Sequence, residues 1–181
     1  MVLLKNRACV TNLLESYDFL TKAYADKDSV DMVLLDFAKA FDTVPHKRLL
    51  LKITKYGIDN QVLAWIKSFL SNRRQRVILG DSISSWLPVT SGVQQGSVLG
   101  PTLFILFIND LPDMIKNNCL IYADDTKIAA KIRQNNITED IQMLQSDINI
   151  VKKWTDMWLV RLNDKKCKVM HFGKKTQMQI I

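Results

Sequence analysis

The sequence is poor in the residues that build disulfide frameworks and zinc sites. Its 181 residues include three cysteines and two histidines. Cys9, Cys119 and Cys167 are odd in number, far apart and without a C-x-x-C pair, so neither a disulfide framework nor a zinc site is indicated. His46 and His171 alone offer little for a histidine-based metal site or a Ser-His relay. The cysteine pattern favours a reducing, intracellular location, nuclear or cytoplasmic.

Long apolar runs are also lacking. The longest, LFILFI at residues 103–108, is far shorter than the ~18 residues that a membrane span requires. The opening segment MVLLKNRACV is too short in its apolar part, and too soon interrupted by charge, to be a signal peptide. We therefore expect neither a membrane segment nor a targeting signal.

What the chain does contain suits one globular domain with a sizeable core. Hydrophobic residues make up 48% of it and charged residues 24%. Its net charge of +7 and pI near 9.3 suit a polyanionic partner such as nucleic acid, although plain solubility would explain the charge equally well. No linker, repeat or low-complexity tract divides the chain, so residues 1–181 are predicted to form a single domain.

The apolar periodicity predicts an α+β fold, a small antiparallel sheet packed by helices. In the first helix, Asn12 is the expected cap, and the apolar stripe comprises Leu13, Leu14, Tyr17, Leu20 and Tyr24. Helices are expected at residues 11–28, 46–56, 61–72, 102–111 and about 138–157. Strands are expected at residues 29–37, in a hairpin at 74–89 turning at Gly80 and Asp81, and in the segments at 119–132 and 167–172.

The segment CLIYADDTKIAAKI, residues 119–132, alternates like a half-buried strand but carries Asp124 and Asp125 side by side. Two like charges about 4 Å apart repel by roughly 4 kcal/mol at an effective dielectric of 20. Because aspartate tolerates turn conformations, a tight hairpin centred here would present both carboxylates at its tip.

A divalent cation would convert this repulsion into attraction. Mg²⁺ prefers oxygen ligands and commonly binds one or two carboxylates together with substrate phosphates. A third carboxylate would allow two ions about 3.5 to 4 Å apart, as in phosphoryl transfer, and Asp36 at the end of the strand at 29–37 is the obvious donor. The alternative is a polar hairpin turn with Asp36 as a helix cap.

Four segments together resemble the reverse transcriptases of non-LTR retrotransposons, most closely the jockey-like and related animal elements. They are VLLDFAKAFDTVPHKRLL, SGVQQGSVLGPTLFILFINDLP, YADDTKIAA and WLVRLNDKKCKVMHF, in the order and spacing of that family. The resemblance covers nearly the whole chain. It implies a polymerase palm with part of the fingers and no thumb, and RNA-directed DNA polymerase activity.

The resemblance also implies roles for individual residues. Asp36, Asp124 and Asp125, with the backbone carbonyl of Phe37, would hold two Mg²⁺ ions, for which Mn²⁺ could substitute. Lys166 would donate a proton to the leaving pyrophosphate, although a solvated lysine in a turn would look the same.

Other matching residues would contact the nucleotide and the nucleic acid. Phe41 matches the aromatic gate that excludes a ribose 2′-hydroxyl, Gln95 and Gly96 match residues beside the nucleotide and template, and Tyr122 supports the primer end. Each assignment has a structural alternative. Phe41 could be an ordinary core aromatic, Gln95 and Gly96 part of an ordinary glycine-rich loop, and Tyr122 a plain strand aromatic. Gln94 departs from the pattern, because the family usually has proline there, and loss of that fixed φ should loosen the loop.

Three further arginines complete the expected nucleic-acid site. Arg73, Arg74 and Arg76, near Trp65 and Phe69, could grip phosphates of primer and template, with charged surface as the competing explanation. Two other carboxylates are expected to cap or pin helices, namely Asp42 and Asp110.

The expected substrates are an RNA template, a DNA primer and deoxynucleoside triphosphates. Two other hypotheses stay open. The chain could be a catalytically silent nucleic-acid-binding remnant of such a polymerase, or another two-metal phosphotransferase built on the same palm.

Overall fold

The computed structural model describes residues 9–173. They cluster into two compact units, one made of the chain up to Ala38 and from Asn109 onward, the other of Lys39–Ile108. The single domain expected over residues 1–181 stays a prediction. Residues 1–8, which carry most of the segment considered as a signal peptide, lie outside the described residues.

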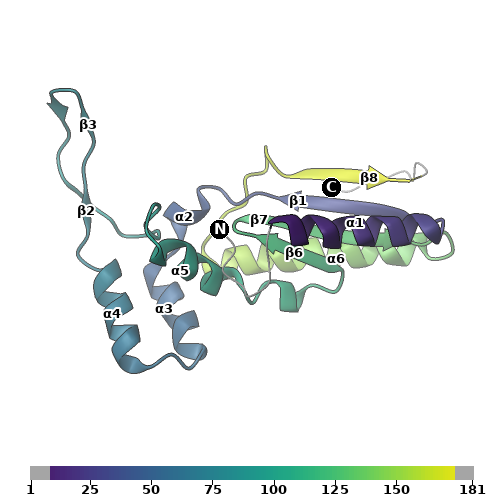
Figure 1. Cartoon of the computed structure of the whole chain (residues 1–181), viewed down its shortest axis with the longest axis horizontal. Helices are drawn as coiled ribbons and strands as arrows, with labels where there is room; N and C mark the ends of the chain where they lie inside the picture. The colour runs from purple at the N-terminus through teal and green to yellow at the C-terminus, as the bar shows by residue number, and fades with distance from the viewer. Residues whose placement is uncertain (1–8, 174–181) are drawn as a thin grey trace. The chain divides into compact units, whose positions relative to one another are not determined.

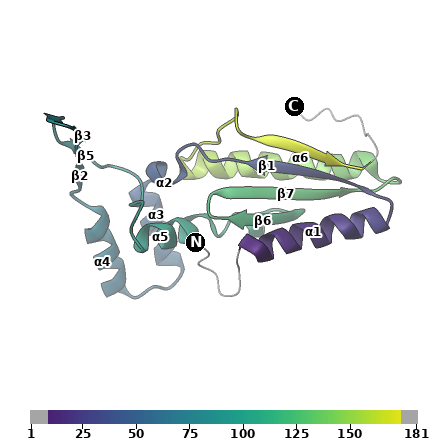
Figure 2. The same cartoon turned by 45° about the horizontal axis from the view of Figure 1, so that its top comes forward.

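The first unit is built on a four-stranded antiparallel sheet with the order β6-β7-β1-β8. Figures 1 and 2 show helices α1 and α6 running along this sheet. The strands are β1 (Ser29–Leu35), β6 (Asn118–Tyr122), β7 (Asp125–Ile132) and β8 (Lys168–Phe172). The helices are α1 (Cys9–Ala25), α6 (Ile137–Trp158) and the short η1 (Pro112–Met114).

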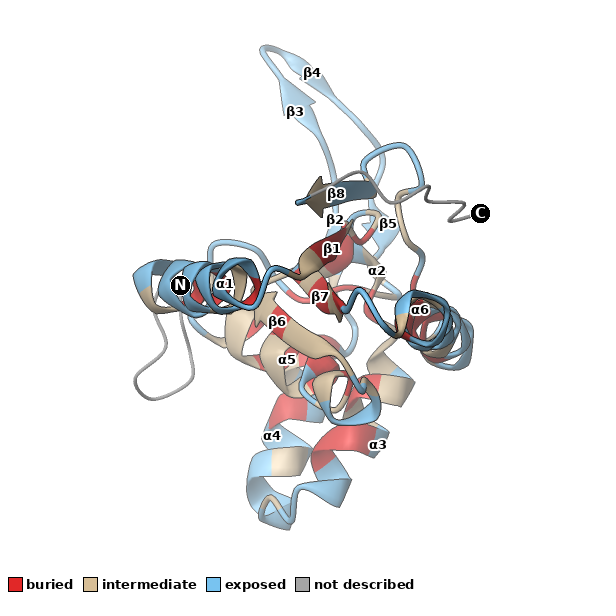
Figure 3. Ribbon diagram, turned by 90° about the vertical axis from the view of Figure 1, so that its right-hand side faces the viewer, coloured by how far each residue is buried: buried red, intermediate tan, exposed pale blue. Residues whose placement is uncertain are grey.

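The two faces of β1 are covered by different helices, because neighbouring side chains of a strand point in opposite directions. Val30 and Met32 pack with Ala23 of α1 and Ala129 of β7. Just beyond the strand, the Phe37 ring lies edge-on to Trp154 of α6, with ring centroids 6.1 Å apart. The near-continuous apolar run of β1 is thus explained by burial on both sides, which Figure 3 shows in red.

Helix α1 forms as predicted, but it presents a different face to the sheet. Leu13, Leu14, Tyr17 and Tyr24 of the expected apolar stripe are 59–83% exposed, whereas Asn12, Ser16 and Ala23 are buried. Asn12 lies inside the helix and is therefore not its cap. The small polar side chain of Ser16 faces inward because it accepts a hydrogen bond from Lys127 Nζ of β7 at 3.1 Å.

The second unit is a helical cluster that carries a long hairpin. Helix α3 contacts both α4 and α5, and α2 contacts α5. Its elements are α2 (Ala40–Thr43), α3 (His46–Lys55), α4 (Asn60–Leu70), β2 (Arg74–Gln75), β3 (Ile78–Leu79), β4 (Ser82–Ile83), β5 (Leu87–Pro88) and α5 (Leu99–Ile108). Lys52 is buried here because its ammonium group donates to the Phe107 carbonyl at 2.6 Å and lies 4.8 Å from that residue's ring centroid.

Most predicted boundaries hold because they rest on local chemistry. The Asp59 side chain accepts from the Gln61 backbone N–H and so begins α4. The hairpin turns at Gly80, which has φ +56°, and Asp81. The short α2 escaped prediction, and α5 spans Leu99–Ile108 instead of the predicted 102–111. In the described part of the chain, no helix combines the length and hydropathy of a membrane span.

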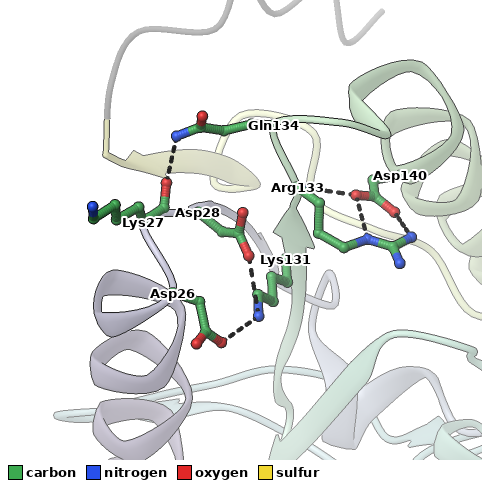
Figure 4. A network of polar contacts seen from close by, with 7 residues as sticks. All are labelled: Asp26, Lys27, Asp28, Lys131, Arg133, Gln134 and Asp140. Carbon is green, nitrogen blue, oxygen red and sulfur yellow. Dashed lines mark hydrogen bonds and ion pairs between the residues drawn. The ribbon is translucent and has the colours of Figure 1, made fainter.

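A network of hydrogen bonds and ion pairs lies at the end of the sheet where β7 ends (Figure 4). Asp140, 6% exposed at the start of α6, accepts from the backbone N–H, Nε and Nη2 of Arg133 at 2.6–3.1 Å. These hydrogen bonds lower the pKa of Asp140 below its ordinary value of 3.8, against an opposing effect of burial. Lys131 of β7 pairs beside them with Asp26 and Asp28.

We predict that Asp140→Asn lowers the free energy of unfolding by about 1.5–3 kcal/mol, the scale of a hydrogen bond to a charged group. Because the folded-state pKa is depressed, the wild-type contribution is complete above the ordinary pKa near 3.8 and is lost as the pH falls through the lower folded value. Urea unfolding at pH 7 and at pH 3 measures this. The difference between the two proteins should shrink at pH 3.

Asp156→Asn is the matched control, since Asp156 lies on the same helix and pairs with Lys152 while 65% of its side chain is exposed. It should change stability by less than about 0.5 kcal/mol. Equal effects of the two substitutions would contradict the role given to the Arg133 contact.

Candidate active site

The paired aspartates lie at the tip of the β6–β7 hairpin, as the sequence predicts. Tyr122 pairs with Asp125, so only Ala123 and Asp124 separate the strands. Ala123 has φ +56°, a left-handed conformation that reverses the chain tightly. Asp124 is half-buried and Asp125 exposed.

Asp36 approaches the same tip through the pairing of β1 with β7. Leu35 pairs with Thr126 in the last pair of this ladder, so Asp36 and Asp125 are the next residues on the two chains at that end. Two carboxylates that are 89 positions apart in the sequence thus meet at one end of the sheet.

The electrostatics of Asp125 reflect this arrangement. Desolvation raises its pKa, and the negative charges of Asp124 and Asp36 raise it further. Lys127 and Lys166 oppose this effect and lower the pKa of the same carboxyl group. The end of the sheet therefore concentrates three acidic groups that interact with one another.

Two lysines offset this negative charge. The Lys166 ammonium nitrogen lies 3.7 Å from Asp36 Oδ1, with 68% of its side chain exposed. Lys127 stands two residues after Asp125 on β7 and is held by Ser16. Lys127 is not among the residues predicted for the site, although its i+2 spacing from Asp125 on a strand places both on one face.

The chemistry of this donor set fits a hard divalent cation, since all three side chains offer carboxylate oxygens. Among residues 9–173, however, no three His, Cys, Asp or Glu side chains stand close enough together to form a metal-ion cage. Desolvation raises the pKa of Asp125, and the negative charges of Asp124 and Asp36 raise it further.

Backbone bonds fix the position of Asp36. Its carbonyl accepts from the Asn163 N–H at 2.8 Å, and the Ala38 N–H donates to Arg161 O at 2.8 Å. The neighbouring Phe37 is 4% exposed and packs on Trp154. The indole N–H of Trp154 in turn donates to Asp110 Oδ1 at 3.1 Å, so Asp110 pins α6 as expected.

In the second unit, Phe41 stacks on Phe104 of α5, with ring centroids 4.7 Å apart and an interplanar angle of 26°. The residue is half-buried, so one part of it is supported by the core and another is accessible. This arrangement is compatible both with a core aromatic and with a rigid gate.

The glycine-rich loop is tied to the turn around Phe41. Val93 N–H donates to Phe41 O at 2.7 Å, and Gly92 N–H donates to Val44 O at 2.8 Å. Gly92 has φ +90°, and a Cβ there would meet backbone atoms of residues 41 and 42 at 2.7–2.9 Å. Only glycine permits this approach.

Gln95 and Gly96 lie exposed in this loop, where the Gln95 amide nitrogen donates to Asp42 Oδ1 at 3.4 Å. Asp42 therefore holds this loop. The loop also compensates for Gln94, because Ser97 Oγ donates to Gln94 O at 2.8 Å and accepts from Gly100 N–H at 3.0 Å.

The arginines follow α4 and enter the hairpin. The Arg73 guanidinium lies 5.9 Å from the Phe69 ring centroid, and that of Arg76 lies 4.6 Å from the ring centroid of Trp86. The ring of Trp65 stacks on that of Phe69, with ring centroids 6.2 Å apart. The contact of Arg76 with Trp86 was not foreseen.

The predicted residues thus divide between the two units. The first brings together Asp36, Asp124, Asp125 and Lys166, with Tyr122 paired to Asp125 beside them. The second carries Phe41, Gln95, Gly96, Arg73, Arg74 and Arg76.

The family model described as reverse transcriptase (RNA-dependent DNA polymerase) matches residues 4–181. The RNA-directed DNA polymerase from mobile element jockey of Drosophila melanogaster is 35% identical over 88% of this chain and 18% of its own length. The Drosophila funebris protein of the same name is 34% identical over 86% of this chain and 18% of its own length.

A third relative is the probable RNA-directed DNA polymerase from transposon BS of Drosophila melanogaster, 33% identical over 87% of this chain and 18% of its own length. The chain thus spans less than a fifth of the length of these relatives. The resemblance carried by the four motifs is confirmed, and the chain belongs to the reverse transcriptase family of non-LTR retrotransposons.

Proposed function

We propose that this chain is the catalytic portion of an RNA-directed DNA polymerase, adding deoxynucleotides to a primer 3′-hydroxyl on an RNA template. The observation that carries the proposal is the convergence of Asp36, Asp124 and Asp125 at one end of a sheet. Like charges are costly to gather, and such clusters are typical of functional sites. We assign the sheet unit to the palm and residues 39–108 to part of the fingers.

Asp36, Asp124 and Asp125, with the carbonyl of Phe37, would hold two divalent ions, Mg²⁺ or Mn²⁺. Ions bound there supply activation of the attacking hydroxyl and neutralisation of the charge on the leaving pyrophosphate. Lys166, beside Asp36 and largely exposed, holds a proton at Nζ that it can donate to the leaving group. Lys127 keeps the cluster partly neutralised before substrate arrives.

The remaining residues position substrate. Phe41, braced by Phe104, would exclude a 2′-hydroxyl, and Gln95 and Gly96 would lie against the nucleotide and template. Tyr122 would support the primer end next to the aspartates. Positioning and charge stabilisation would then supply most of the rate enhancement, because phosphoryl transfer asks little covalent chemistry of the protein.

Primer extension on an RNA template with Mg²⁺ or Mn²⁺ tests the carboxylates. We predict that Asp36→Asn and Asp124→Asn each lower the extension rate at least about 100-fold, since each removes a charge worth several kcal/mol at the reacting phosphate. Asp156→Asn, on the exposed face of α6, should extend at the wild-type rate. Extension by the two site variants at that rate would refute the assignment.

A melting scan supplies a readout that does not depend on turnover. Added Mn²⁺ should raise the melting temperature of the wild type, because a ligand that binds only the folded state stabilises it. Asp124→Asn should lose this increase. A wild type that binds template, gains stability with Mn²⁺ and never extends a primer would instead be the catalytically silent remnant.

The gate role of Phe41 makes a separate prediction. Phe41→Ala should lower the preference for deoxynucleotides over ribonucleotides, measured as the ratio of their kcat/KM values, by about tenfold or more. Single-nucleotide incorporation measures the ratio. Phe69→Ala, in α4, is the control and should leave it unchanged. A ratio that does not move in Phe41→Ala would leave Phe41 as a core residue.

A further inference from the structure

One face of the long hairpin gathers two arginines and a tryptophan. Arg74 pairs with Pro88 and Gln75 with Leu87, so the next position of this register sets Arg76 opposite Trp86. The guanidinium of Arg76 lies 4.6 Å from the Trp86 ring centroid, which agrees with this register. Because side chains alternate along a strand, Arg74, Arg76 and Trp86 share one face, which we call the hairpin face.

The hairpin face is open to solvent. Every residue from 74 to 88 is exposed, and Trp86 is 52% exposed. Figure 3 shows the hairpin of β3 and β4 in the colour of exposed residues. Tryptophan is highly buried on average, so a half-exposed indole stacked under a guanidinium is not explained by core packing.

The surroundings of this face are basic. Between residues 60 and 98, four basic residues are present with a single acidic one, Asp81. At the foot of the hairpin lies a cavity of about 640 Å³ whose lining includes three basic residues and one acidic residue, namely Lys39, Arg73, Arg74 and Asp42. The charge complements a polyanion, and the cavity offers room for a phosphate group.

We infer that the hairpin face binds single-stranded nucleic acid, with an unpaired base stacked on Trp86 and phosphates contacted by Arg74 and Arg76. The inference rests on the proposed function, since it adds a contact for the strand that the polymerase copies. A base has a flat π-face that extends the Arg76–Trp86 stack, and stacking on aromatic rings is tolerant of sequence. A duplex hides its base faces, so this contact selects single strands.

The test is equilibrium binding of a fluorescent single-stranded RNA and of a matched RNA–DNA duplex, measured over a range of salt concentrations without metal or nucleotide. Trp86→Ala should weaken single-strand binding at least about fivefold, the lower end of one stacked base, and leave duplex binding unchanged. Its slope of log affinity against log salt should stay at the wild-type value, because no charge is removed.

Arg76→Ala should reduce that salt slope by about 0.7 for single strands, the expected loss of one phosphate contact. Arg76→Lys should keep the slope and still weaken binding, since lysine keeps the charge without the planar group that stacks. Two controls match these variants: Leu87→Ala, next to Trp86 on the opposite face and 59% exposed, and Lys67→Ala on α4. Both should bind single strands as the wild type does.

Wild-type affinity of Trp86→Ala for single strands, or equal losses for single strand and duplex, would overturn the inference. Melting temperatures equal to the wild type confirm that the exposed substitutions leave the fold intact. Asp124→Asn should bind single-stranded RNA normally. If Asp124→Asn loses extension while Trp86→Ala binds single strands like the wild type, only this inference is refuted. If Asp124→Asn still extends a primer while Trp86→Ala binds single strands weakly, only the catalytic assignment is refuted.

Discussion

The antiparallel register between β1 and β7 is the constraint on which the candidate site depends. Seven pairs, from Ser29 with Ile132 to Leu35 with Thr126, fix where Asp36 stands relative to the β6–β7 tip. A slip of one residue would turn every side chain of β1 to the other face. The register is held because β1 buries apolar residues along its length, with Val30 and Met32 packed against Ala23 of α1 and, just beyond the strand, Phe37 against Trp154 of α6. Core packing thus determines the spacing of groups that do no packing themselves.

Gathering carboxylates at one edge has an electrostatic cost that the fold partly offsets. Lys127 and Lys166 both lower the pKa of Asp125, and Lys127 is anchored through Ser16 of α1. This arrangement explains why α1 turns a polar side chain toward the sheet. The helix gives up apolar burial at that position to satisfy a lysine beside the acidic cluster, which is the kind of local inconsistency expected near functional sites.

In the second unit, backbone hydrogen bonds set the positions of the candidate substrate-contacting residues. The turn at residues 41–44 and the loop at 91–93 are joined by hydrogen bonds of 2.7–2.8 Å, and Gly92 lets the two backbones approach. The turn that carries Phe41 and the loop that carries Gln95 are therefore held together as one backbone framework. Asp42, which the sequence predicts to cap or pin a helix, accepts a hydrogen bond from Gln95 of this loop. The projecting hairpin adds aromatic and basic surface without contributing to the core.

Local chemistry made much of this protein predictable from sequence. Asp59 as a cap, Gly80 and Asp81 as a turn and the tight hairpin at Asp124 and Asp125 all depend on residues near in the chain. The ordered motifs were likewise sufficient to identify the family. Hydrogen-bond partners that lie far apart in the chain could not be predicted from local sequence patterns. Asp147 is fully buried because it accepts from the backbone N–H groups of residues 116 and 117, about 30 positions away.

The sequence by itself determined the longer helices, the hairpins and the family, because periodicity, turn residues and motif spacing depend on residues that are near one another in the chain. Only the tertiary structure decided which face of α1 meets the sheet, that Lys127 joins the acidic cluster, and that Arg76 stacks on Trp86. The apolar stripe of α1 predicts an amphipathic helix, but it does not determine which face of that helix packs against the sheet. That choice depends on charges that strand pairing brings together from positions far apart.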